Sequence, residues 1–176
     1  EKLVARRNRR AEKRLMKRPE FANAITEYAK VSNVTGASMS DYLTLYEEVR
    51  TRKPKEILEL GTGFTTVVMA QALIENAAEG APLGRITSME EHEGWTQTAL
   101  KALPQDVAHV VQIVHSPKVD GFYKLFRGVQ YADIPIRAYD FAPCAGRDDA
   151  FIEGIVQEVD SMESGFISYK IEVTAE

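Results

Sequence analysis

The chain has 176 residues, of which 44% are hydrophobic and 27% are charged, a composition typical of a soluble globular protein. This excludes a disordered chain, because so many apolar side chains can form a core, and a disulfide scaffold, because Cys144 is the only cysteine. No apolar run is long enough to span a membrane, and residues 1–18 lack the apolar core of a signal peptide. We therefore expect a cytoplasmic protein with one globular body.

The net charge of −4 is distributed unevenly along the chain. Residues 1–18 carry nine lysines and arginines against two glutamates, a net charge of +7, and we call them the basic arm. The remaining residues carry 13 basic and 24 acidic side chains, a net charge of −11. Such an arm can bind nucleic acid or an anionic membrane, but it is more often a solvated helix face or a frayed terminus. No aromatic side chain interleaves the arginines for stacking on single strands. Nucleic acid is therefore not the favoured partner.

Residues 19–54 predict two amphipathic helices, which would form a helical cap in front of the first strand. Ser40 or Asp41 is the expected cap of the second helix, and Pro54 is expected to end it. In both segments apolar side chains recur at helical spacing: Phe21, Ala24, Ile25 and Tyr28 in the first, and Tyr42, Leu45, Tyr46 and Val49 in the second.

Residues 55–176 alternate between short apolar runs and helical patterns, which favours an α/β fold with a doubly wound, mostly parallel sheet and helices on both faces. In the last expected strand, apolar and polar residues alternate from Ile167 to Val173, which is typical of an edge or antiparallel strand and offers one route to a homodimer. The C-terminal part of the sheet would then be abbreviated. The expected strands are 56–60, 85–89, 110–115 and 139–144, and the expected helices are 67–78, 95–103 and 148–161.

The most specific motif is Glu59-Leu60-Gly61-Thr62-Gly63-Phe64-Thr65-Thr66, between an expected strand and an expected helix. Glycines at such a turn allow positive φ and a close approach of a ligand to the backbone, and the free amides of the next helix favour an electronegative partner. Thr66 occupies the place of the third glycine of the dinucleotide fingerprint, which argues against a dinucleotide-dependent oxidoreductase. The next strand delivers Glu90 and Glu91 to the same sheet edge, where a carboxylate can bind a ribose.

Three segments together resemble the class I S-adenosylmethionine-dependent methyltransferases, and their order and spacing agree over about residues 40–165. They are Ile57 to Gly63, Ser88 to His92, and Tyr139-Asp140-Phe141. The resemblance implies a Rossmann-like fold, S-adenosylmethionine as cofactor and a small-molecule acceptor. The cofactor-binding residues that it implies are Glu59, Gly61, Thr62, Gly63, Phe64, Glu90, Glu91, His115 and Ser116.

Within this resemblance, Gly61 and Gly63 would approach the methionine part of the cofactor and Glu59 would orient its amino group through the loop. Glu90 would bind the ribose, and His115 and Ser116 would lie beside the adenine. Methyl transfer needs alignment and exclusion of water more than catalytic side chains, so no catalytic residue is assigned. An oxygen acceptor would need a general base, for which His92 and His115 are candidates.

The fourth-strand segment departs from the family pattern. Ala145 stands where the family has an acidic residue, and Pro143 would remove a hydrogen bond from a central strand, which predicts a bulge or irregular turn. These departures support an alternative, a catalytically inactive nucleotide-binding or interaction module on the same fold. The acceptor, the methylated atom and the oligomeric state do not follow from the sequence.

Other residues with functional chemistry have simpler structural interpretations. Cys144 follows a proline, as the nucleophile of cytosine-C5 methyltransferases does, but a buried structural cysteine is favoured. The histidines and the cysteine show no metal-ligand spacing, so no metal is expected. Trp95 is expected to pack in the core, and the same is expected of the aromatic group Phe122, Tyr123, Phe126 and Tyr131, whose alternative role is to line an acceptor pocket.

Overall fold

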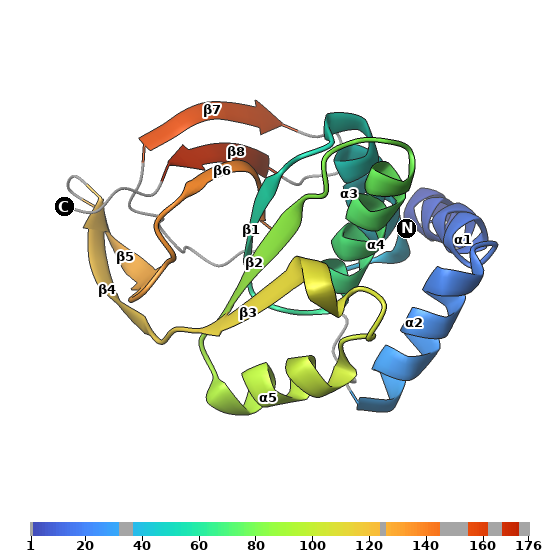
Figure 1. Ribbon diagram of the computed structural model, residues 1–176, viewed down its shortest axis with the longest axis horizontal. Helices are drawn as coiled ribbons and strands as arrows, with labels where there is room; N and C mark the ends of the chain where they lie inside the picture. The colour runs from blue at the N-terminus through green and yellow to red at the C-terminus, as the bar shows by residue number, and fades with distance from the viewer. Residues whose placement is uncertain (1, 32–36, 124–125, 145–154, 162–166, 173–176) are drawn as a thin grey trace.

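The computed structural model describes residues 2–31, 37–123, 126–144, 155–161 and 167–172. Its main sheet has six strands in the order β3-β2-β1-β6-β8-β7, and a separate hairpin, β4–β5, lies at the opposite end of the molecule from the N-terminal helices (Figure 1). The strands are β1 Glu56–Leu60, β2 Arg85–Glu90, β3 Val111–His115, β4 Lys118–Tyr123, β5 Phe126–Tyr131, β6 Ala138–Cys144, β7 Ile155–Ser161 and β8 Ile167–Glu172.

Four neighbouring strands of the sheet, β3, β2, β1 and β6, are parallel, which confirms the predicted α/β, Rossmann-like architecture. β1 pairs in parallel with both β2 and β6, and β2 pairs in parallel with β3. Helix α4 (Phe64–Ala78) connects β1 to β2, and helix α5 (Glu93–Ala102) connects β2 to β3. The chain therefore builds outward from β1 in one direction and later returns to place β6 on the other side of β1.

The expected helices on both faces of the sheet occur on one face of the described structure. Ile57 and Ile86 face the core beneath the helices, whereas Leu58 and Met89 face a second cluster that contains Tyr131 and no residue of a described helix. Right-handed crossovers that run in the same direction put α4 and α5 on the same face. The connection from β3 to β6, which would cover the other face, contains the β4–β5 hairpin instead.

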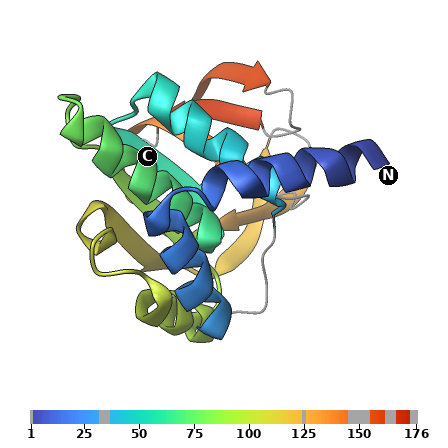
Figure 2. The ribbon, with the colours of Figure 1, turned by 90° about the vertical axis from the view of Figure 1, so that its right-hand side faces the viewer.

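Three N-terminal helices pack outside α4: α1 (Lys2–Leu15), α2 (Pro19–Val31) and α3 (Met39–Arg52). Figure 2 shows α1 lying across the layer that α3 and α4 form. Helix α1 buries Ala11 and Leu15, so part of the basic arm is an ordered helix with an apolar side. The residues that join these helices in the core are Phe21, Ala24, Tyr28, Tyr42, Leu45, Tyr46 and Val49, as their spacing predicted.

The start of α3 differs from the prediction by two residues. Ser38 is the cap, since its hydroxyl accepts from the Asp41 amide at 3.4 Å and the Asp41 carboxylate accepts from the Ser38 amide at 2.8 Å. This reciprocal pair is a capping box. The end agrees with the prediction, because Lys53 adopts a left-handed conformation (φ 52°) directly before Pro54.

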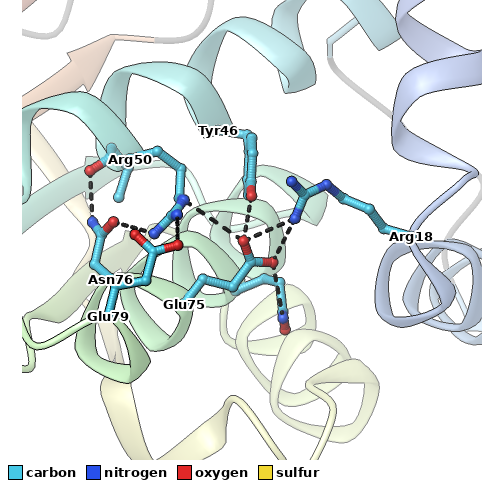
Figure 3. A network of polar contacts seen from close by, with 8 residues as sticks. Arg18, Tyr46, Arg50, Glu75, Asn76 and Glu79 are labelled. Atoms are coloured by element: carbon cyan, nitrogen blue, oxygen red, sulfur yellow. Dashed lines mark hydrogen bonds and ion pairs between the residues drawn. The ribbon is translucent and has the colours of Figure 1, made fainter.

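A polar network around Glu75 joins the helices (Figure 3). Arg18 Nη1 donates to both Glu75 oxygens at 2.8 and 2.9 Å, and the Tyr46 hydroxyl donates to the same carboxylate. Arg50 Nε lies 3.6 Å from Glu75 Oε2, and its Nη1 donates to Asn76 Oδ1 at 2.5 Å. The network therefore ties α3 and the segment between α1 and α2 to one carboxylate on α4.

The C-terminal strands correct two predictions. Residues 155–161, expected at the end of a helix, form strand β7, while residues 148–154 lie outside the described residues. Strand β8 is antiparallel, as its alternating pattern predicted, but it lies between β6 and β7 and is not an edge strand. Both of its sides are paired within the chain, so β8 offers no free edge to a second copy.

The predicted irregularity in β6 is present. The register between β6 and β8 shifts between Tyr139 and Ala142, directly before Pro143. Pairing of β6 with β1 is limited to Ile57 and Phe141.

None of the helices in the described part of the chain is long and apolar enough to cross a membrane.

Candidate functional site

The glycine loop leaves β1 where the order of the strands reverses, with β2 on one side and β6 on the other. In open α/β sheets, ligands bind in the crevice at such a switch point, outside the carboxyl ends of the strands. Gly61 has φ +93° and donates its amide to Met89 O at 2.9 Å. No atom lies within 4 Å of the place of a Cβ on Gly61, so glycine is needed there for its backbone conformation.

A buried carboxylate lies under this loop. Glu59 is 2% exposed, and three hydroxyl groups donate to it: Thr65 Oγ1 and Thr66 Oγ1 at 2.5 Å and Ser88 Oγ at 2.7 Å. The pKa of Glu59 is raised from 4.5 to about 7: burial is the largest cause, the three hydrogen bonds lower the pKa, and the charge of Glu90 raises it. Glu59 therefore braces the loop through hydroxyl groups, and no cation of the described part of the chain pairs with it.

Thr66 explains why the third glycine of the dinucleotide fingerprint is missing. Its hydroxyl accepts from the Gly63 amide at 3.1 Å while it donates to Glu59 Oε2. The Thr66 amide also donates to Gly63 O at 3.1 Å. A glycine at this position would leave both the carboxylate and the loop amide without these partners. The threonine therefore belongs to the support of the loop.

Two tyrosines of the N-terminal helices pack at the same loop. The Phe64 ring lies 5.6 Å from the Tyr28 ring and 5.0 Å from the Tyr42 ring, centroid to centroid. A Cβ on Gly63 would lie 3.7 Å from the Tyr28 hydroxyl. Helical spacing assigned both tyrosines to the core, and only the packing of α2 and α3 shows that they lie beside the glycine loop.

Glu90 ends β2 next to the loop. Its side chain is 9% exposed, and Oε1 accepts from the His92 amide at 3.0 Å. Among the described residues, nothing donates a hydrogen bond to Oε2 of Glu90. Glu91 has a different environment, because Lys118 Nζ lies 3.3 Å from its Oε1. Only Glu90 thus combines burial with an oxygen that is available to a ligand.

His115, the last residue of β3, and Ser116, which follows it, hold the adjoining segments of the chain in place. His115 is paired in register with Glu90, and its Nε2 lies 3.2 Å from Glu91 O. Ser116 is fully buried, donates its amide to Glu90 O at 2.9 Å and accepts from the Asp133 amide at 2.8 Å. The Ser116 hydroxyl therefore supports the segment after β5.

The structure brings the predicted site residues together in two adjacent groups. The residues at the end of β1 lie beside those at the ends of β2 and β3, because β1 and β2 pair in parallel with Leu60 opposite Met89. The first group is Glu59, Gly61, Thr62, Gly63 and Phe64, and the second is Glu90, Glu91, His115 and Ser116.

Several other predictions about single residues have a definite outcome. Trp95 is 48% exposed, so the prediction that it packs in the core is wrong: it lies in the first turn of α5. Tyr131 is buried, as expected. The imidazole of His92, a candidate base, is exposed and lies 3.7 Å from the Glu91 carboxylate. Ala145 and the side chain of Cys144 lie outside the described part of the chain.

No group of three or more histidine, cysteine, aspartate or glutamate side chains is placed to hold a metal ion among the residues that the structure describes.

Two hollows lie away from the glycine loop. One, of about 260 Å³, is lined by residues of α2, α4 and the segment after α5. The other, of about 910 Å³, lies between α1 and α3.

Comparison with known proteins finds similarity at the level of structure alone. No model of a protein family matches the chain, and no curated protein sequence matches it. A methyltransferase of Podospora anserina, solved with S-adenosylhomocysteine, is 17% identical over 53% of this chain and 41% of its own, with a TM-score of 0.44. An O-methyltransferase of Streptomyces achromogenes involved in tomaymycin synthesis, solved with S-adenosylmethionine, is 25% identical over 52% of this chain and 40% of its own, with a TM-score of 0.41. The matched part thus spans less than half of each of these structures.

Proposed function

We propose that this chain binds S-adenosylmethionine at the carboxyl ends of β1 and β2 and transfers its methyl group to a small-molecule acceptor. The observation that carries the proposal is the pairing of the braced glycine loop after β1 with the available Glu90 oxygen after β2. Both lie at the switch point of the sheet, where α/β folds bind their ligands. Two of the three segments that resemble class I methyltransferases lie at these same two strand ends, and the third lies in β6.

The residues at the site suit such a cofactor. The space beside Gly61 is empty of protein atoms within 4 Å of a Cβ position, so a ligand can approach the backbone there. Oε2 of Glu90 can accept a hydrogen bond from a ribose hydroxyl, since no described residue uses it. The amides at the start of α4 favour an electronegative group.

Each part of the site has its own task in this proposal. When bound, S-adenosylmethionine supplies an electrophilic methyl group on a sulfonium. Glu90 orients the ribose, Gly61 and Gly63 admit the methionine part, and Glu59 keeps the loop in shape through Thr65 and Thr66. His92, exposed beside Glu91, is the candidate to accept a proton from an oxygen acceptor.

Calorimetric titration tests the cofactor assignment. S-adenosylmethionine and S-adenosylhomocysteine should bind with micromolar affinity, and NAD should give no signal. Glu90→Ala should weaken binding by about five- to hundredfold, because a ribose hydroxyl loses a hydrogen bond worth roughly 1 to 3 kcal/mol. Glu91→Ala is the matched control, since Glu91 lies one residue away and already pairs with Lys118. Its affinity should stay within about twofold of the unchanged chain.

Equal affinities of the unchanged chain and Glu90→Ala would remove Glu90 from the site. Absence of binding by both adenosyl compounds would overturn the proposed cofactor. Binding without turnover on a broad panel of acceptors would favour the alternative of a module that binds nucleotides without catalysis, for which the irregular β6 is the structural reason.

A further inference from the structure

The largest hollow described above lies between α1 and α3, on the outer side of the helical layer. One wall is a face of α1 and the other is the N-terminal half of α3, represented by Ser40, Leu43, Thr44 and Glu47. We call this hollow the basic groove, because five cations line it: Arg6, Arg7, Arg10, Lys13 and Arg14. These positions fall on one side of the helix and extend over about 12 Å of its axis.

Most of these cations have no partner in the described part of the chain. Arg14 pairs with Glu47 at 2.6 Å across the groove. Among the described residues, the other four make neither an ion pair nor a hydrogen bond, and all are exposed. Four unpaired cations in one groove, on a body with a net charge of −11 outside the basic arm, form a strongly local positive surface. The rest of the molecule repels the anions that this groove attracts.

The shape and lining of the groove favour one class of anion. A helix that lies on a membrane presents a broad apolar face, whereas the exposed large apolar side chains of α1 are Leu3 and Val4, both at its first turn. Single-stranded nucleic acid is held by aromatic stacking, and no aromatic side chain lines this groove. A duplex needs neither feature, since rows of arginine and lysine bind its phosphates.

We propose that the basic groove binds the phosphate backbone of a double-stranded nucleic acid without reading its sequence. The surface is separate from the proposed cofactor site, so the inference goes beyond the proposed function and stands without it. The two sites share α3: Leu43 and Thr44 face the groove, while the neighbouring Tyr42 packs against Phe64 at the glycine loop. A bound duplex would thus lie against the helix that supports the loop.

Fluorescence anisotropy with labelled DNA and RNA duplexes of about 20 base pairs, without S-adenosylmethionine, tests the proposal. Both duplexes should bind, and different sequences should bind equally. Neutralising four phosphates predicts a slope of about −3.6 for the logarithm of the binding constant against the logarithm of salt concentration. This corresponds to a loss of about 150-fold in affinity between roughly 50 and 200 mM salt.

Two double variants that each remove two positive charges distinguish binding of duplex in the basic groove from attraction of duplex to the overall charge of α1. Arg6→Gln with Arg10→Gln removes two groove cations and should reduce the slope to about −1.8. Lys2→Gln with Arg9→Gln removes two cations of the same helix that do not line the groove, and should leave the slope unchanged. Glutamine has nearly the helix propensity of arginine and lysine, so both variants should keep α1, which circular dichroism checks.

Three results would overturn the proposal. The first is an equal loss of duplex binding in the two double variants, which would mean attraction to overall charge. The second is binding of phosphatidylserine vesicles, lost in the groove variant, without binding of duplex. The third is competition by poly-glutamate at the same charge concentration as duplex, which would indicate an acidic protein partner. Since only binding is measured, none of these results bears on the proposed methyl transfer.

Discussion

Among the glutamates that have several polar partners in the described structure, Glu75 and Glu59 have partners of opposite kinds. Glu75, on the outer helices, accepts from Arg18 and Tyr46 and lies near Arg50 (Figure 3). Glu59, under the glycine loop, accepts from three hydroxyl groups and has no cationic partner among the described residues. Guanidinium groups match the charge of a carboxylate, whereas hydroxyl groups only solvate it.

The two carboxylates therefore have different roles: Glu75 joins helices through ion pairs, and Glu59 supports the glycine loop through hydrogen bonds. The charge of Glu75 is balanced, and its negative field together with burial and a hydrogen bond raises the pKa of Tyr46 to about 12, with burial the largest cause. Glu59 has no such balance, so burial raises its pKa to about 7. The helical layer is therefore joined by a fixed charge pair, while the loop rests on a group that changes charge near neutral pH.

The largest expected effect is a dependence of stability on pH that originates at Glu59. A folded-state pKa raised from 4.5 to about 7 gives a contribution that is fully present below 4.5 and is lost as the pH rises through 7. The loss amounts to roughly 3 kcal/mol. Urea unfolding of the unchanged chain and of Glu59→Gln at several pH values measures it.

Glu59→Gln should remove this pH-dependent part of the free energy of unfolding, because glutamine does not ionise. The difference in the free energy of unfolding between the variant and the unchanged chain should therefore shift in favour of the variant as the pH rises from 5 to 8. A pH-independent difference would show that Glu59 is ionised throughout this range in the folded protein. It would also remove the contrast with Glu75.

A smaller effect is expected from Glu75→Gln, which leaves Arg18 and Arg50 without their shared carboxylate. Because these groups are between 21% and 42% exposed, we expect a loss of about 2 kcal/mol in the free energy of unfolding, less than for a fully buried pair. Glu79→Gln is the control, since Glu79 is 58% exposed and, within the described ranges, forms an ion pair with Arg50 alone. It should cost less than about 0.5 kcal/mol, and equal losses would argue against a central role of Glu75.

The smallest of the three effects is expected from Thr66→Val, which keeps the shape of the side chain and removes its hydroxyl. Glu59 loses a donor and the Gly63 amide loses an acceptor, at a cost of about 1 kcal/mol. Since this hydrogen bond lowers the pKa of Glu59, its loss should move the pH dependence of stability to higher pH. An unchanged midpoint would mean that Thr66 does not help to stabilise the charged carboxylate.

Much of the fold could be predicted because local patterns carried it. The alternation from β1 to β3 follows from short apolar runs and helical spacing, and both β1 and the glycine loop lie where the sequence placed them. The prediction of a helix over residues 155–161 failed because Ile155 and Val159 fit a helical spacing as well as a strand. Their β-branched side chains favour a strand, and pairing with β8 decided the outcome, which no local pattern reveals.

The sequence predicted which residues meet at the ends of β1, β2 and β3, but not the hydrogen bonds that hold them. Glycines and acidic residues at the strand ends identified Gly61 and Glu90, since their positions follow from the order of the elements. The hydroxyl support of Glu59 was missed, because Ser88 and Thr66 come from different elements and meet only in the folded sheet. The exposure of Trp95 was missed because the sequence does not show which side of α5 faces the core.

That exposed indole has a practical consequence. Trp95 is the only tryptophan of the chain, and it is 48% exposed three residues after His92, in the first turn of the helix that follows Glu90. The tryptophan emission of the protein therefore comes from one place, at the start of the helix that follows β2. Every change in hydration or quenching at that place is visible without a label, so the molecule carries its own optical reporter of events at the end of β2.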